Sequence, residues 1–136
     1  MKYILILLVS LAMGIHESTD IRKPAPGYQL IIFVGSDWCP NCRRLEMNIL
    51  SDSLFISYLK NNDILIELID FPQRNKQNQA QITHNKQIAE QYKFKGIFPT
   101  LILTLRDTLA YQKVSYVDMN VNNIIAEIEQ CKLKLK

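Results

Sequence analysis

The sequence predicts an α/β fold, with a central mixed β-sheet of about four strands and helices on both faces. Two observations predict it. Short apolar runs that end at turn residues alternate with segments whose apolar side chains recur at helical spacing. In chain order these segments read strand, two helices, strand, helix, two strands and helix. The 136 residues, 48% hydrophobic and 21% charged, suffice for one domain with its own core and exclude a disordered chain.

The N-terminal segment predicts export. Lys2 precedes an apolar run at 3–13, and the small residues Ala12 and Gly14 stand where a signal peptidase requires them. We therefore expect residues 1–14 to be a cleaved signal peptide and the protein to be periplasmic or extracellular. The alternative is an uncleaved membrane anchor. It is disfavoured because a spanning helix needs about 20 apolar residues.

The predicted domain occupies residues 29–136, after a polar leader at 15–28 that contains two prolines and a glycine. The continuous apolar run 30–34 ends at Gly35 and predicts a strand buried on both faces. A helical stretch follows, in whose first turn Pro40 costs no hydrogen bond.

The remaining elements follow from the same spacing rules. They are a helix at 52–60, a buried strand at 64–69, a polar loop at 73–81, a helix at 82–93 that Gly96 ends, strands at 100–105 and 109–116, and a last helix capped by Asp118 or Asn120. The predicted inner faces of the last two helices are Ile82, Ile88, Ala89 and Tyr92, and then Val121, Ile124, Ile125, Ile128 and Cys131.

The segment with the most specific chemistry is Trp38-Cys39-Pro40-Asn41-Cys42, between a strand and a helix. Cys39 lies at the helix N-terminus, where unpaired N–H groups and the helix dipole favour a thiolate. Such a position typically lowers the pKa of the attacking thiol below its free value of about 8.5. Cys42 lies one turn further along, where it can resolve a mixed disulfide formed at Cys39.

Other uses of two cysteines are less well supported. A zinc site needs four ligands, and the other candidates, Cys131, His16 and His84, are scattered in the sequence. Haem attachment needs a histidine where Arg43 stands. A purely structural disulfide would close a loop too short to stabilise much. We expect neither a metal nor an organic cofactor, and Cys131 on an apolar helix face is expected to be a buried, inert thiol.

The segment from Phe33 to Cys42 resembles the active-site segment of thioredoxin-like proteins, especially exported bacterial ones with a GSDWC lead-in. Further matches fall in the family's order at Glu46, the helix at 54–59, Asp70-Phe71-Pro72 and Gly96-Ile97-Phe98-Pro99-Thr100. The resemblance implies a thioredoxin fold, with Cys39 as nucleophile and Cys42 as resolving thiol. It also implies that Pro99 is a cis-proline beside the pair, although a proline at a strand start is an alternative reading. The substrate-binding surface expected from it comprises Trp38, Pro40, Ile97, Phe98 and Pro99.

Three departures from the family pattern qualify the resemblance. Phe33 stands where thioredoxin has a buried acid, and Ile66 stands where it has a nearby lysine, so proton transfer at Cys42 must use water or another group. Two residues separate Gly96 from Pro99, where thioredoxin has one. The polar stretch after Pro72 is longer than in thioredoxin.

These observations together predict an exported thiol–disulfide oxidoreductase that acts on protein thiols or disulfides. Its electrons would come from, or pass to, a membrane thiol protein, and the neutral Asn41 favours a reductant or isomerase. We expect a monomer, and no nucleic-acid partner because the net charge is only +3. Two alternatives remain open: a non-catalytic binding module that holds a partner in the cis-proline groove, and a metal-binding domain.

Overall fold

The computed structural model describes residues 27–136. The predicted signal peptide at 1–14 and the leader up to residue 26 lie outside the described residues. Tyr28, which the sequence assigns to the leader, is instead the first residue of a strand. No helix within 27–136 is long and apolar enough to cross a membrane.

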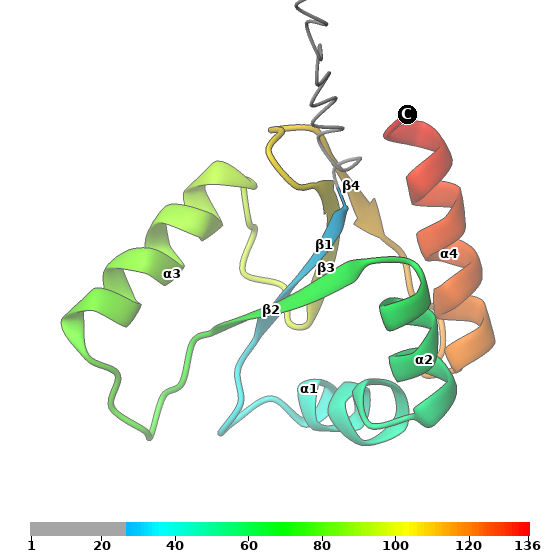
Figure 1. Ribbon diagram of the computed structural model, residues 1–136. Coiled ribbons are helices and arrows are strands. Elements are labelled where there is room, and N and C mark those ends of the chain that lie inside the picture. Colours follow the sequence, from blue (N-terminus) through cyan, green and yellow to red (C-terminus); the bar gives the residue numbers. More distant parts are fainter. Residues whose placement is uncertain (1–26) are drawn as a thin grey trace, which may run out of the picture.

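Four strands form one mixed sheet in the order β2-β1-β3-β4 (Figure 1). They are β1 (Tyr28–Val34), β2 (Ile64–Asp70), β3 (Thr100–Leu105) and β4 (Tyr111–Val114). Strand β1 runs parallel to β2 and antiparallel to β3, and β3 runs antiparallel to β4. Because parallel neighbours need a long crossover, helices connect β1 to β2, whereas a short turn connects β3 to β4.

Helices cover both faces of the sheet, as predicted (Figure 1). They are α1 (Pro40–Leu45), which continues into a π-helical turn η1 (Glu46–Leu50), α2 (Ser53–Asn61), α3 (Gln79–Gln91) and α4 (Val121–Lys134). We call the side covered by α1, α2 and α4 the three-helix face, and the side covered by α3 the α3 face. Alternate residues of β1 point to opposite faces, so Leu30 and Ile32 join one core and Ile31 and Phe33 the other.

Polar side chains cap the helices and set where they begin. Asp52 accepts the backbone N–H groups of Leu54 and Phe55, at 2.8 and 3.2 Å, at the start of α2. Of the two candidate caps for α4, Asn120 is the one used. Asn78 caps α3 in a reciprocal pair with its third residue, so this helix begins three residues earlier than predicted.

The prediction that the second strand is buried is wrong. Strand β2 lies at the edge of the sheet, and Leu65 and Leu68 are each 53% exposed. The first strand is buried on both faces as predicted, because it has neighbours on both sides and helices above and below. The strand predicted at 109–116 is shorter, spanning only Tyr111–Val114.

Helix α3 also differs from its prediction. Ile82, predicted to face inward, is 42% exposed, and Asn85 is buried instead. The Asn85 side chain donates a hydrogen bond of 2.7 Å to the backbone oxygen of Asp70, which satisfies its buried amide. The helix ends at Gln91, two residues before the predicted end, and Lys93, with a φ of 51°, makes the left-handed turn that follows it. Gly96, predicted to end the helix, lies further along the loop with a φ of 75°.

Candidate active site

Cys39 and Cys42 form a disulfide at the start of α1, with their Cα atoms 5.3 Å apart. Cys39 caps the helix, and its sulfur accepts the backbone N–H of Cys42 at 3.2 Å. Only 3% of Cys39 and 5% of Cys42 is exposed, whereas the intervening Pro40 and Asn41 are exposed. The helix start therefore supplies a hydrogen-bond donor to the sulfur that would carry negative charge after reduction.

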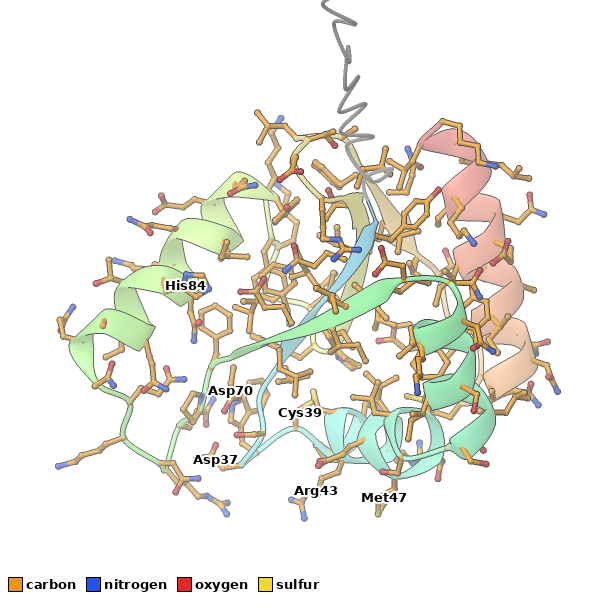
Figure 2. The ribbon with its side chains drawn as sticks, in the orientation of Figure 1. Asp37, Cys39, Arg43, Met47, Asp70 and His84 are labelled. Carbon is orange, nitrogen blue, oxygen red and sulfur yellow. A yellow bond between two sulfur atoms is a disulfide. The ribbon has the colours of Figure 1, made fainter. Side chains whose placement is uncertain are left out.

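The loop before Cys39 is tied to the end of β2. Ser36 donates from its backbone N–H and its hydroxyl to the Asp70 carboxylate, at 2.9 and 2.6 Å. The Trp38 indole N–H donates to the backbone oxygen of Phe71 at 2.8 Å. Figure 2 shows Asp70 at the same end of the molecule as Cys39. These bonds fix the position of the cysteine pair relative to the sheet.

Gly35 is required by the close approach of Trp38. A Cβ atom at position 35 would lie 2.4 Å from the indole ring, a distance that side chains do not tolerate. The indole in turn packs edge-on against the Phe98 ring, with centroids 5.1 Å apart. The glycine thus allows the tryptophan to connect the cysteine loop to the loop that carries Pro99.

Asp37 anchors the polar loop that follows Pro72. Its carboxylate accepts the backbone N–H groups of Gln73, Arg74 and Asn75 at 2.9, 2.7 and 2.7 Å. These hydrogen bonds, that from Gln73 foremost, lower the pKa of the Asp37 carboxyl group because they favour its charged form. The sequence does not single out Asp37. An aspartate directly before Trp-Cys is the only signal that could have identified it.

The loop before β3 brings a cis peptide bond, between Phe98 and Pro99, beside the cysteine loop. Tyr116 donates its hydroxyl to the Pro99 backbone oxygen at 2.5 Å, and burial raises the pKa of this tyrosine. Pro99 is buried and Phe98 is half-buried, whereas Ile97 is 59% exposed. Of the expected substrate-binding residues, the structure therefore brings Trp38 and Phe98 into contact and leaves Ile97 and Pro40 open to solvent.

The position of thioredoxin's buried acid is occupied by an aromatic cluster. Phe33 is fully buried and stacks on Phe94, with ring centroids 4.3 Å apart. Phe94 in turn meets Phe98 edge-on at 5.0 Å. The core under the cis-proline loop is therefore apolar. Phe94 is not predicted as a core residue from the sequence, because it lies between two lysines.

A carboxylate does lie on the other side of Cys42. A cavity of about 120 Å³ on the three-helix face is lined by Cys42, Glu46, Arg43, Ser36, Val34, Leu50 and Leu68. Glu46 is the one carboxylate in this lining and lies one helical turn after Cys42. In the sequence Glu46 is recognisable only as a match to the family, which assigns it no role.

The third cysteine is buried, as predicted. Cys131 is 4% exposed on the inner face of α4, and its thiol donates to the Lys113 backbone oxygen at 3.6 Å. Burial raises the pKa of this thiol. Within residues 27–136 no three histidine, cysteine or acidic side chains are grouped as a metal site requires.

Comparisons with known proteins agree with this geometry. The disulfide bond reductase DsbH of Chlamydia pneumoniae is 34% identical over 93 residues, which are 68% of this chain and 52% of that protein. The chain thus spans about half the length of that relative. A solved structure of the DsbH oxidoreductase superposes with a TM-score of 0.66 at 25% identity, covering 82% of this chain and 75% of the other.

A thioredoxin structure from Thermus thermophilus superposes with a TM-score of 0.52 at 16% identity, covering 79% of this chain and 75% of the other. This likeness concerns the fold alone. Residues 19–128, most of the chain, match the thioredoxin-like domain family. The fold, the cysteine pair that begins α1 and this match agree: the chain belongs to the thioredoxin-like domain family.

Proposed function

We propose that this protein is a thiol–disulfide oxidoreductase that acts on protein disulfides through Cys39 and Cys42. The observation that carries the proposal is their disulfide at the start of α1, beside the loop of Pro99. The 34% identity to a protein named a disulfide bond reductase supports it.

The proposed reaction starts from the reduced pair. The Cys39 thiolate attacks one sulfur of a substrate disulfide, and the other substrate sulfur leaves as a thiolate that takes up a proton. Cys42 then attacks the Cys39 sulfur of the mixed disulfide. This step releases the substrate as a dithiol and leaves the Cys39–Cys42 disulfide, so two electrons have passed from the protein to the substrate. The N–H of Cys42, 3.2 Å from the Cys39 sulfur, stabilises the attacking thiolate.

Cys42 must lose its proton before it can attack, and Phe33 cannot accept one. We assign this task to Glu46, because its carboxylate and Cys42 line the same cavity of about 120 Å³. A cavity of this size has room for a water with polar partners, which can relay the proton between the two groups. Glu46, which is exposed to solvent, thereby takes over the proton-accepting role of thioredoxin's acid from the other face of the sheet.

The substrate chain is proposed to lie along the expected surface of Trp38, Pro40, Ile97, Phe98 and Pro99. Pro40, between the two cysteines, and Ile97, in the loop of Pro99, supply exposed apolar contacts. Electron flow is proposed to run towards the substrate, because Asn41 between the cysteines carries no charge and the similar DsbH is named a reductase.

The same proposal covers where the protein is located and which protein supplies its electrons. Residues 1–14 act as a signal peptide, and the domain that begins with β1 at Tyr28 works as one exported domain after a leader at 15–27. Outside the cytoplasm a membrane thiol protein must then re-reduce the pair. The domain is proposed to act as a monomer.

Insulin reduction tests the proposal. Wild-type protein with dithiothreitol is expected to accelerate insulin precipitation, and Cys39→Ser is expected to abolish the acceleration. Cys131→Ser is the matched control and should retain it, since this buried thiol takes no part. Equal, negligible turnover in wild type and Cys39→Ser would contradict the proposal.

Two observations favour a second function, a non-catalytic module that holds a partner in the cis-proline groove. Phe33 replaces the family's buried acid, and the cysteine pair is almost fully covered. Such a module would bind its partner equally well with the pair oxidised or replaced by serines, and would not turn over insulin.

A further inference from the structure

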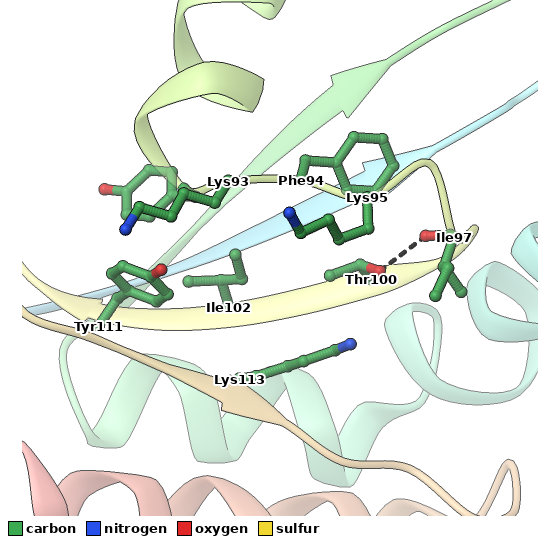
Figure 3. Close-up of a pocket in the computed structure, with 9 residues that line it drawn as sticks. Lys93, Phe94, Lys95, Ile97, Thr100, Ile102, Tyr111 and Lys113 are labelled. Carbon is green, nitrogen blue, oxygen red and sulfur yellow. Dashed lines mark hydrogen bonds between the residues drawn. The ribbon is translucent and has the colours of Figure 1, made fainter.

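A second cavity lies on the α3 face of the sheet, away from Cys42. Its volume is about 300 Å³, and it lies between the segment from Tyr92 to Ile97 and strands β3 and β4 (Figure 3). Ile102 of β3 lies in its lining and is 3% exposed. The mechanism proposed above makes no use of this cavity.

Strand geometry explains why β4 contributes a cation to it. Side chains two residues apart on a strand share a face, so Tyr111 and Lys113 point the same way. Lys113 is paired in register with Ile102, whose side chain belongs to the core of the α3 face. The ammonium group of Lys113 is thereby held on the α3 face, beside the cavity.

The opposite wall contributes two more lysines. Phe94 turns inward to stack on Phe33, and its neighbours Lys93 and Lys95 are left exposed. Figure 3 shows Lys93 and Lys95 on one side of the cavity and Lys113 on the other.

The lining is strongly biased towards positive charge. It contains three lysines and no carboxylate, and none of these lysines forms a salt bridge within residues 27–136. Three like charges around one concave site raise the local potential and favour an anion there. Tyr92 and Tyr111, edge-on at 5.2 Å, add an aromatic wall whose hydroxyl groups can donate hydrogen bonds.

The cavity is continuous with the loop that is proposed to bind the substrate. Ile97 and Thr100 line it, and Phe98 and Pro99 lie between them in the chain. Because successive Cα atoms are about 3.8 Å apart, Ile97 and Thr100 are at most about 11 Å apart. A substrate chain beside Pro99 can therefore reach the lysines within a few residues.

We propose that this cavity binds an acidic side chain of the substrate protein, an aspartate or glutamate within a few residues of the target disulfide. The inference rests on the proposed function and names a substrate class for it: disulfides with acidic neighbours. A nucleic acid is a poorer fit, because binding to it requires a long track of cations rather than three lysines around one cavity.

Binding is tested without any thiol chemistry. The probes are two fluorescein-labelled, cysteine-free peptides of the same sequence, except that one has two glutamates where the other has two glutamines. Each peptide is titrated with the oxidised full chain, and binding is followed by fluorescence anisotropy. The pocket variant is Lys93→Gln/Lys95→Gln/Lys113→Gln. The control, Lys60→Gln/Lys76→Gln/Lys86→Gln, changes the net charge equally at three other exposed lysines.

The acidic peptide is expected to bind wild type and control alike, and the pocket variant about tenfold more weakly, since each exposed ion pair contributes a factor of roughly two to five. The glutamine peptide should bind all three proteins weakly. Equal affinity of the two peptides for wild type, or an equal loss in pocket and control variants, would overturn the inference. Displacement of the peptide by inorganic phosphate at the same ionic strength would also overturn it. So would a single-stranded oligonucleotide that binds the wild type more tightly than the acidic peptide does and no longer binds the pocket variant.

A kinetic arm connects binding to turnover. Cystine peptides with glutamate neighbours are expected to show about tenfold higher kcat/KM than glutamine-flanked ones with wild type, and this ratio should fall towards one in the pocket variant. Insulin reduction by the pocket variant shows whether the cysteine chemistry is intact. If the wild-type protein reduces insulin but shows no preference for glutamate-flanked over glutamine-flanked peptides, this inference alone is contradicted. Absence of turnover with peptide binding retained contradicts only the proposed function.

Discussion

The two faces of the sheet differ in how thickly they are covered. On the three-helix face, 17 buried residues form one core that includes Cys39 and Cys42. On the α3 face, five buried residues form the core, and an open cavity lies beside β3 and β4. The face with the larger core thus holds the atoms that react, and the thinly covered face has an open cavity with room for a ligand.

The largest expected effect is on stability, and it compares how much one isoleucine on each face contributes to the free energy of unfolding. Ile128→Ala on the three-helix face removes a fully buried side chain and is expected to lower the free energy of unfolding by about 3 kcal/mol. Ile88→Ala on α3 is the matched substitution and should cost about 1 kcal/mol, because Ile88 is half-buried. Urea denaturation measures both. Equal losses of unfolding free energy in the two variants would mean that the two faces contribute equally to stability, which would contradict the comparison.

A second prediction separates the chemistry of the two faces. Glu46→Gln removes the carboxylate that shares a cavity lining with Cys42 and is expected to slow resolution of the mixed disulfide about a hundredfold, at the low end of general-base effects. The initial attack by Cys39 should be unchanged. Quenched-flow trapping of the mixed disulfide measures the two steps separately.

The control for Glu46 is Glu90→Gln, at an exposed carboxylate on α3. It should leave both steps unaltered. If Glu46→Gln slowed attack and resolution by the same factor, its effect would be on the fold of the site and not on the proton of Cys42.

The smallest expected effect concerns acid stability. Hydrogen bonds from Gln73, Arg74 and Asn75 lower the pKa of Asp37 in the folded state. Its contribution to stability is therefore complete above the pKa of the unfolded chain and is lost as the pH falls through the lower folded value. Asp37→Asn should narrow the stability difference between pH 7 and pH 3, as followed by thermal unfolding. An unchanged difference would argue against this linkage.

The sequence predicts those elements whose pattern is local. The continuous apolar run 30–34 identifies β1, one of the two interior strands, and the strand predicted at 100–105 has the same bounds in the structure. Cys39 and Cys42 are identified by their spacing before a helix. In each case residues that are close in the sequence are enough to predict the feature.

Features that depend on distant neighbours are not predicted. The apolar run 64–69 resembles a buried strand, and only the strand order shows that it lies at an edge. The inward turn of Phe94 depends on Phe33, and the placement of Lys113 beside the cavity depends on its register with β3. Cavities arise from such long-range packing, so neither the one at Glu46 nor the one among the lysines is visible in the sequence.

The central claim is that Cys39 is the attacking thiol, and trapping the mixed disulfide tests it most directly. Reduced Cys42→Ser protein is incubated with a peptide disulfide, and the attachment site is read by peptide mass spectrometry. We expect a stable adduct at Cys39 with Cys42→Ser and none with Cys39→Ser. An adduct at Cys131, or equal adducts in both variants, would contradict the account.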